Sequence, residues 1–258
     1  MKSQNNRQAN DYLSDQEFKK MSTKQKLEYF WQYRRKQMIF FCIEVAIILA
    51  LLIVVTQKKE VMLTGIALNS DDKIEKDVLH QIKNDLFEGT QLNPEKGEIE
   101  LVYGLKYYLN DETKAEDNYS IVQMLVEQTK KNNLDFIVGD QETVVVLAYS
   151  EFFYDLSQVL SEEQIALYTP YLRYIDLSVV EQIKKAAESN LSNVDIEIPD
   201  CTKPEEMQNP IPIMIDITQY DAFTDLYPET SEPIVFAMFE GTPARNVLTN
   251  FIEYIIKE

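Results

Sequence analysis

Residues 61–108 read VMLTGIALNSDDKIEKDVLHQIKNDLFEGTQLNPEKGEIELVYGLKYY and change their hydrophobic period twice. Residues 61–69 are apolar and rich in β-forming side chains, which predicts a strand. Apolar side chains at helical spacing then predict a helix over 73–87, and Gly89 supplies its stop. Strand character returns over 98–108. This strand–helix–strand order is typical of an α/β sheet with parallel neighbours.

The same alternation continues toward the C-terminus. A helix is expected over 117–131, and a short buried strand over 134–138 is closed by Gly139 and Asp140. Further helices are expected over 142–150, 153–160, 161–167, 179–189, 220–226 and 243–257, and further strands over 171–177, 194–198, 211–217 and 233–239. The prediction is therefore an α/β domain, 57–258, with a mainly parallel sheet flanked by helices. About 200 residues suffice for one compact core.

A transmembrane helix is predicted to precede this domain. Residues 38–56 read MIFFCIEVAIILALLIVVT, with Glu44 as their one charge. A helix of this length spans roughly 28 Å, about the thickness of the bilayer hydrocarbon. A buried core helix would carry a polar face, which this run lacks. A cleavable signal peptide would have a much shorter leader than residues 1–37 and a small-residue cleavage site, so an uncleaved signal anchor is predicted.

Charge on the two sides of this span predicts its orientation. Residues 1–37 hold nine Lys and Arg against four Asp and Glu, a net charge of +5. Residues 57–258 hold 16 Lys and Arg against 38 Asp and Glu, a net charge of -22. Because basic flanks stay inside, the tail 1–37 is placed in the cytoplasm and the domain outside the cell membrane. The tail is expected to be partly disordered and then helical, with capping-box spacing at Ser14 and Ser22.

Glu44 has two interpretations, which the sequence leaves open. A carboxyl group within the span is costly, and it could sit shallow, partly protonated or reaching toward the cytoplasmic headgroups. Alternatively it contacts another membrane helix through a hydrogen bond, in self-association or with a multi-span partner such as a transporter. The bilayer itself is the first expected partner.

Sequence features of catalysis and metal binding are sparse. The chain has one His, His80, and two Cys, Cys42 and Cys201, which the span separates. No nucleophile elbow or phosphate-binding glycine loop is present in the sequence. Three acidic groups, Asp71-Asp72, Asp195 with Glu197, and Glu205-Glu206, are expected by chance in a domain this acidic. We therefore expect no enzyme, no cofactor and no metal site, and the overall charge of -18 argues against nucleic acid as a partner.

A ligand site is expected where the strand 134–138 ends. Open α/β sheets bind ligands outside the carboxyl ends of their strands. Asp140 and Gln141 follow this strand, and Tyr149 follows in the next helix, so these three are the candidate ligand residues. Seven aromatic residues crowd the 26-residue stretch 149–174, either as core packing or as an exposed binding face.

Several stretches resemble known groups of proteins. They are LDFIV at 134–138, FYDLSQVL at 153–160 and IVFAMF at 234–239 with the helix that follows it. These are similar to extracytoplasmic solute-binding proteins of ABC importers. SxKxKLEYFWxY at 22–33 and PEEMxNPIPI at 204–213 are similar to single-pass membrane proteins of Gram-positive gut bacteria.

The resemblance implies a reduced solute-binding domain of the type-2 periplasmic-binding kind. Only about 33 residues separate Leu177 from Ile211, too few for a second lobe, and no lipid-anchoring Cys follows the span. The resemblance thus implies one lobe. The expected function is a non-catalytic accessory or interaction domain held at the membrane, beside a transporter. The alternative is a tethered receptor that binds a small solute or peptide at the strand ends.

Overall fold

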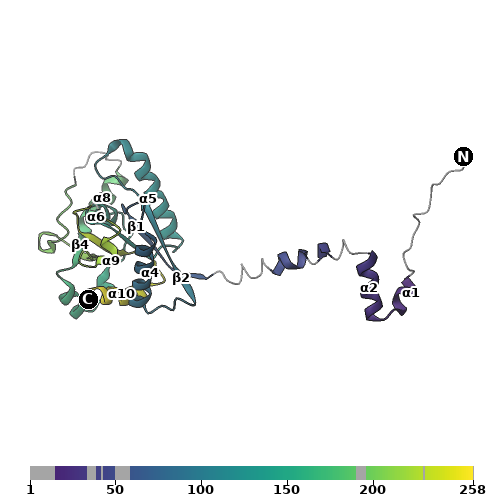
Figure 1. Cartoon of the computed structure of the whole chain (residues 1–258). Coiled ribbons are helices and arrows are strands. Elements are labelled where there is room, and N and C mark those ends of the chain that lie inside the picture. The colour runs from purple at the N-terminus through teal and green to yellow at the C-terminus, as the bar shows by residue number, and fades with distance from the viewer. Residues whose placement is uncertain are drawn as a thin grey trace. The chain divides into compact units, whose positions relative to one another are not determined.

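The computed structural model describes residues 15–33, 39–41, 43–49, 59–189, 196–228 and 230–257. These residues belong to two compact units that divide between Lys58 and Lys59. Figure 1 labels helices of both units and some strands of the second. The described part of the first unit is helical, and the second holds the sheet.

Two short helices begin the described part of the first unit: α1, Asp15–Lys20, and α2, Thr23–Tyr33. The backbone N–H of Ser22 donates to Gln25 Oε1 at 3.0 Å, and the N–H of Gln25 donates to Ser22 Oγ at 3.4 Å. The capping box predicted at Ser22 is therefore confirmed. The start predicted at Ser14 lies outside the described residues.

Residues 39–41 and 43–49 are helical and expose their apolar side chains, with Phe40 at 67%. No helix in the described ranges is both long and apolar enough to cross a membrane. The predicted span 38–56 includes residues 38, 42 and 50–56, which lie outside those ranges. The span therefore stays a prediction.

Six strands of the second unit form one sheet in the order β2-β1-β3-β6-β5-β4. Their bounds are β1, Glu60–Leu68; β2, Gly97–Leu105; β3, Phe136–Asp140; β4, Leu172–Asp176; β5, Pro210–Asp216; and β6, Ile234–Met238. β1 is parallel to β2 and β3, whereas β6 lies antiparallel between β3 and β5, and β4 is antiparallel to β5. The α/β class is confirmed, and the sheet is mixed, with β4 and β6 reversed against the other four strands.

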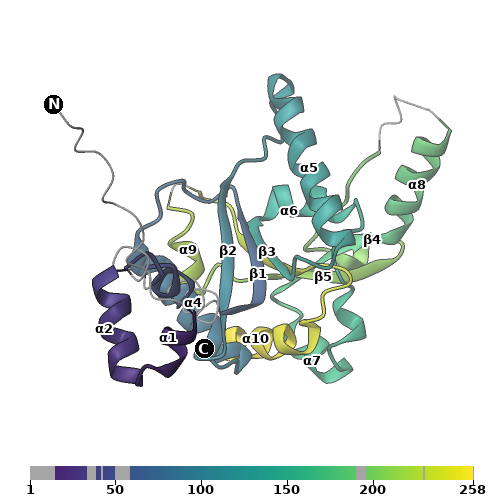
Figure 2. The same ribbon diagram turned by 90° about the vertical axis from the view of Figure 1, so that its right-hand side faces the viewer.

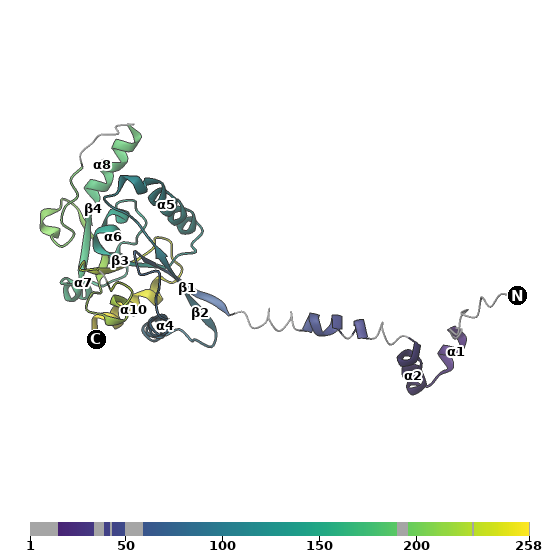
Figure 3. The ribbon, with the colours of Figure 1, turned by 45° about the horizontal axis from the view of Figure 1, so that its top comes forward.

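Helices cover both faces of this sheet. They are α4, Lys76–Thr90; α5, Ala115–Lys130; α6, Gln141–Ala148; α7, Glu162–Tyr168; α8, Leu177–Glu188; α9, Asp221–Thr224; and α10, Arg245–Lys257. α4 and α10 pack on one face, and α5, α6 and α8 lie on the other (Figures 2 and 3). α9 packs with α4. The sheet is thus the middle of three layers.

Successive side chains of a strand point to opposite faces of the sheet, and they fill one hydrophobic core on each face. Leu63 packs in the core beneath α4 and α10, whereas Ile66 packs in the core beneath α5 and α6. Gly65 leaves room for the ring of Phe136, since a Cβ there would lie 2.1 Å from that ring. The Phe136 ring in turn stacks on Phe236 with centroids 5.4 Å apart.

The helix predicted over 153–160 is wrong. Phe153 instead forms a β-bridge with Phe239, just beyond the end of β6. Within the predicted range, only Leu156–Gln158 are helical, and they form a short 3-10 helix. Pairing with the sheet therefore overrides the local helical pattern.

Two other boundaries differ from expectation. Residues 196–200 are irregular, so the strand predicted over 194–198 is absent from its described part. The last helix begins at Arg245 rather than at Pro243. There, Thr242 Oγ1 accepts a hydrogen bond from the N–H of Ala244 at 3.1 Å, which holds the chain in a turn before the helix.

Candidate functional site

The ends of six strands meet along one edge of the sheet, here called the carboxyl edge. It holds the carboxyl ends of β1, β2, β3 and β5 and the amino ends of β4 and β6. α4 returns the chain from β1 to β2 on one face, and α5 returns it from β2 to β3 on the other. The crossovers therefore diverge between β1 and β3, and such a switch point is where open α/β sheets bind ligands.

Asn69 joins three chain segments at this switch point. Its backbone has φ of 60°, the left-handed conformation that Asn tolerates. Its Nδ2 donates to Asp140 Oδ2 at 2.7 Å and to Thr143 Oγ1 at 3.0 Å. Its Oδ1 accepts from the N–H of Tyr107 at 2.6 Å. One side chain thus ties the end of β1 to the end of β3 and to the loop after β2.

Asp140 is the last residue of β3 and caps α6. Its Oδ1 accepts a hydrogen bond from the N–H of Thr143 at 2.9 Å, while Oδ2 accepts from Asn69. A carboxylate at this position also interacts favourably with the positive end of the helix. Asp140 therefore has a structural role at the place where a ligand residue was predicted.

Arg173 organises the neighbouring part of the edge. Its Nε donates to Gln141 Oε1 at 2.8 Å, and its guanidinium forms an ion pair with Asp216. The N–H of Thr218 donates to the same Asp216 carboxylate at 2.9 Å. Because the Arg173 side chain is 11% exposed, this pair is shielded from solvent and fixes Gln141 in place.

Two hollows open at this edge. The first, the switch-point hollow, has a volume of about 280 Å³. Its lining residues are Asn69, Asp71, Lys106, Tyr227, Pro228 and Thr230. Lys106 Nζ donates to the carbonyl of Ser70 at 2.5 Å and lies 3.9 Å from the Asp72 carboxylate. Tyr227 donates its hydroxyl proton to the Val138 carbonyl at 2.8 Å, and burial raises its pKa well above the usual value.

The second hollow, the α6 groove, has a volume of about 610 Å³. It runs over α6 from Gln141 to Val146, between the loop after β2 and the segment before Thr202. Its lining residues are Tyr107, Leu109, Asn110, Gln141, Glu142, Val145, Val146, Ile198, Asp200 and Cys201. The groove and the switch-point hollow thus lie on either side of the pair Asp140–Gln141.

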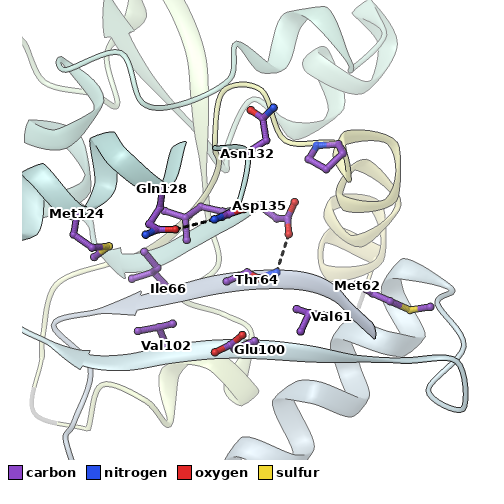
Figure 4. Close-up of a pocket in the computed structure, with 13 residues that line it drawn as sticks. Val61, Met62, Thr64, Ile66, Glu100, Val102, Met124, Gln128, Asn132 and Asp135 are labelled. Atoms are coloured by element: carbon purple, nitrogen blue, oxygen red, sulfur yellow. Dashed lines mark hydrogen bonds between the residues drawn. The ribbon is translucent and has the colours of Figure 1, made fainter. Parts of the chain in front are cut away.

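A third hollow of about 520 Å³ lies at the opposite, amino edge of the sheet (Figure 4). The start of β1, the middle of β2 and the C-terminal half of α5 form its walls. Asp135 is buried beside it and accepts hydrogen bonds from the N–H of Thr64 at 2.7 Å and from Thr242 Oγ1 at 2.6 Å. This carboxylate joins β1 to the loop before α10, which is a structural role.

The predicted site residues are only partly brought together. Asp140 and Gln141 lie side by side at the carboxyl edge, but Tyr149 is at the far end of α6 and only 5% exposed. The Tyr149 hydroxyl accepts from the N–H of Asp176 at 3.4 Å, and burial raises its pKa above the usual range. The aromatic stretch 149–174 is mostly buried, so its interpretation as core packing is confirmed. Glu44 belongs to the first unit and is exposed within the helical residues 43–49.

The His and Cys side chains that the structure describes are His80 and Cys201. His80 is exposed on α4, as predicted, and burial raises the pKa of the Cys201 thiol to about 11. Within the part of the chain that the structure describes, no three His, Cys, Asp or Glu side chains lie together as metal ligands would. Sequence reasoning missed Asn69, Lys106 and Arg173. The polar run after β1 was the available signal for Asn69, whereas Arg173 sits inside an apolar strand and gave none.

Comparisons with family models, with curated proteins and with solved structures found no match to this chain. Functional inference therefore starts from the geometry of the carboxyl edge. That geometry offers two hollows and a rigid polar framework between them.

Proposed function

We propose that this chain is a single-pass membrane protein whose external α/β domain is a non-catalytic receptor, binding its ligand at the carboxyl edge. The observation that carries the proposal is the switch point between β1 and β3, flanked by hollows of about 280 and 610 Å³. Ligand sites of α/β sheets recur at this position.

The charged side chains at the carboxyl edge bond to other protein groups, which supports binding rather than catalysis. Among the described residues, Asp140, Arg173 and Asp216 are already engaged in hydrogen bonds or ion pairs within the protein. The one described thiol, Cys201, stays protonated at neutral pH because its pKa is about 11. An activated nucleophile or a poised acid–base pair would need the opposite arrangement.

The sequence of residues 38–56 and the charge difference across them support the proposed tether, with the domain on the outer face of the cell membrane. The helical conformation of residues 39–41 and 43–49 supports this proposal. Only three residues, 57–59, separate the predicted span from β1. β1 has nine residues, so its carboxyl end lies roughly 30 Å along the sheet from the point of attachment.

The finer fold assignment, a one-lobed relative of type-2 solute-binding proteins, is part of the same proposal. Lys59–Glu258 form one compact unit, which supports one lobe rather than two. A single lobe presents half a cleft, and the ligand would rest on the carboxyl edge instead of being enclosed.

The proposed receptor function is tested by measuring whether a ligand stabilises the full-length protein in an uncharged detergent. The melting temperature is recorded against a panel of amino acids, sugars and short peptides, for wild type, Asp140→Ala and Asp176→Ala. Asp176 is a matched control, because it also ends a strand, caps the next helix (Ser178 N–H at 2.9 Å) and binds further backbone donors (Gln208 N–H at 2.7 Å).

Both substitutions should lower the melting temperature of the free protein, since each removes a helix cap. Only Asp140→Ala should abolish the shift that a ligand produces, because it releases Asn69, which lines the switch-point hollow. If no member of the panel stabilises the wild type, or if both variants respond to ligand like the wild type, binding at the carboxyl edge is wrong.

A second candidate function is an accessory subunit held beside a multi-span membrane protein such as a transporter. Glu44 favours it, because a carboxylate within an apolar helix gains by hydrogen bonding to another membrane helix. Cross-linking in intact membranes should capture a specific multi-span partner with the wild type and lose it with Glu44→Leu. Equal capture by both forms would assign Glu44 no role in that contact.

A further inference from the structure

The α6 groove has an apolar floor. Val145 is buried, Val146 and Leu109 are half-buried, and Ile198 is 41% exposed although it lies in an irregular segment. Apolar side chains that line a concave surface of about 610 Å³ are stabilised when an apolar group covers them. The volume exceeds that of a single side chain, so the groove suits a short stretch of chain.

The rim of the groove is acidic. Glu142 is exposed at the second position of α6, and no hydrogen bond or ion pair of its carboxylate occurs among the described residues. Asp200 is exposed on the opposite wall, where hydrogen bonds from the backbone and hydroxyl of Thr202 hold its pKa below the usual value. Two cations lie nearby: Arg173 is engaged by Asp216, and Lys203 Nζ lies 3.8 Å from the Asp200 carboxylate as an exposed ion pair. Glu142 therefore offers a negative charge that no cation among the described residues neutralises.

The charge of the whole domain also favours a cationic ligand. Residues 57–258 carry a net charge of -22, so their field raises the local concentration of cations and slows the approach of anions. Two amides, Asn110 and Gln141, also line the groove, and amide side chains pair with the carbonyl and N–H groups of a peptide backbone.

We propose that the α6 groove binds a cationic amphipathic peptide, with an apolar side chain on the floor formed by Val146 and Ile198 and with Lys or Arg at Glu142. This inference rests on the receptor function proposed above and names its ligand class. Extended peptides with alternating apolar and basic residues fit this pattern, because successive side chains point to opposite sides.

Calorimetric titration of the full-length protein in an uncharged detergent tests the proposal. The probes are two capped synthetic hexapeptides, Lys-Leu-Lys-Leu-Lys-Leu and Glu-Leu-Glu-Leu-Glu-Leu. Glu142→Lys is compared with Glu163→Lys, which reverses the same charge at the same position of α7, away from the groove. Ile198→Asn is compared with Leu167→Asn, whose side chain is 67% exposed on α7.

The lysine peptide should bind, the glutamate peptide should not, and the affinity should fall as NaCl is raised. Glu142→Lys should weaken binding about tenfold at low salt, as expected for reversal of a rim charge. Ile198→Asn should weaken it about fivefold through lost apolar burial. Each control should stay within about twofold of the wild type.

Equal weakening by Glu142→Lys and Glu163→Lys would show attraction by the overall charge alone and would overturn the groove as the site. Failure of the lysine peptide to bind would overturn the ligand class. Neither result touches the receptor function itself, because that is read from stabilisation by the solute panel and its loss in Asp140→Ala.

Discussion

Asn69 is the residue on which the geometry of the switch point most depends, and Asn69→Ala is the most direct test of it. The substitution removes hydrogen bonds to Asp140, to Thr143 and from the N–H of Tyr107. It also places an alanine at φ of 60°. At roughly 1 kcal/mol for each hydrogen bond, the lost contacts cost about 3 kcal/mol. The left-handed backbone adds about 1 kcal/mol for alanine.

Two companion variants separate these contributions. Asn69→Gly loses the same hydrogen bonds without the steric penalty, so it should be about 1 kcal/mol less destabilising than Asn69→Ala. Asn132 also adopts a left-handed backbone, with φ of 54°, but its side chain makes no hydrogen bond to the described residues. Asn132→Ala should therefore cost only about 1 kcal/mol.

Urea unfolding of the full-length protein in an uncharged detergent, followed by far-UV circular dichroism, measures these differences. The one tryptophan, Trp31, belongs to the first unit, so its fluorescence would not report on the sheet. A loss below about 1 kcal/mol for Asn69→Ala would refute the idea that this side chain ties the strand ends together. Equal losses for the alanine and glycine variants would refute the backbone part of the reasoning.

Three further predictions concern the core. Because the pKa of Cys201 is about 11 in the folded protein against 9.0 for a free thiol, the unfolded chain loses this proton first. The contribution of Cys201 to the free energy of unfolding should thus be unchanged below about pH 8 and should fall between about pH 9 and 11. Urea unfolding at a series of pH values measures this fall, and Cys201→Ala should remove it. Gly65→Ala should cost about 1–3 kcal/mol in urea unfolding, because the new Cβ meets the Phe136 ring, and Phe136→Leu should recover part of that loss. Tyr227→Phe should cost about 1–2 kcal/mol in the same assay by leaving the Val138 carbonyl without its buried donor, and no change would contradict the hydrogen bond.

Much of the domain follows from local periodicity. β1, α4, β2 and α5 lie within a few residues of their predicted ranges, because each is long and has a clear hydrophobic period. Residues 153–160 show the opposite case. Their aromatic and aliphatic side chains fit a helix locally, but Phe153 bonds to Phe239 across 86 residues of sequence, and a pattern read along the chain cannot detect such a partner.

The candidate site was less predictable than the fold. The polar end of β3 at Asp140 marked the carboxyl edge, because a strand end is visible in the sequence. The partner of Asp140, Asn69, lies 71 residues away and becomes a neighbour only because β1 lies between β2 and β3 in the sheet. Antiparallel β6, which separates β3 from β5, is likewise set by the order of strands rather than by its own composition.

The carboxyl edge is rigid, and its rigidity limits how a ligand can be recognised. Asn69 bonds to Asp140, and Arg173 bonds to Gln141 Oε1, so few hydrogen-bonding groups besides the Gln141 amide nitrogen remain there for a ligand. Recognition must then depend on the shape of the hollows and on charge, which gives modest and salt-sensitive affinity. The proposed tether would compensate for modest affinity by raising the effective concentration of the domain at the membrane surface. We therefore expect the proposed receptor and accessory roles to be two aspects of one function, in which a membrane partner covers the open side of the carboxyl edge.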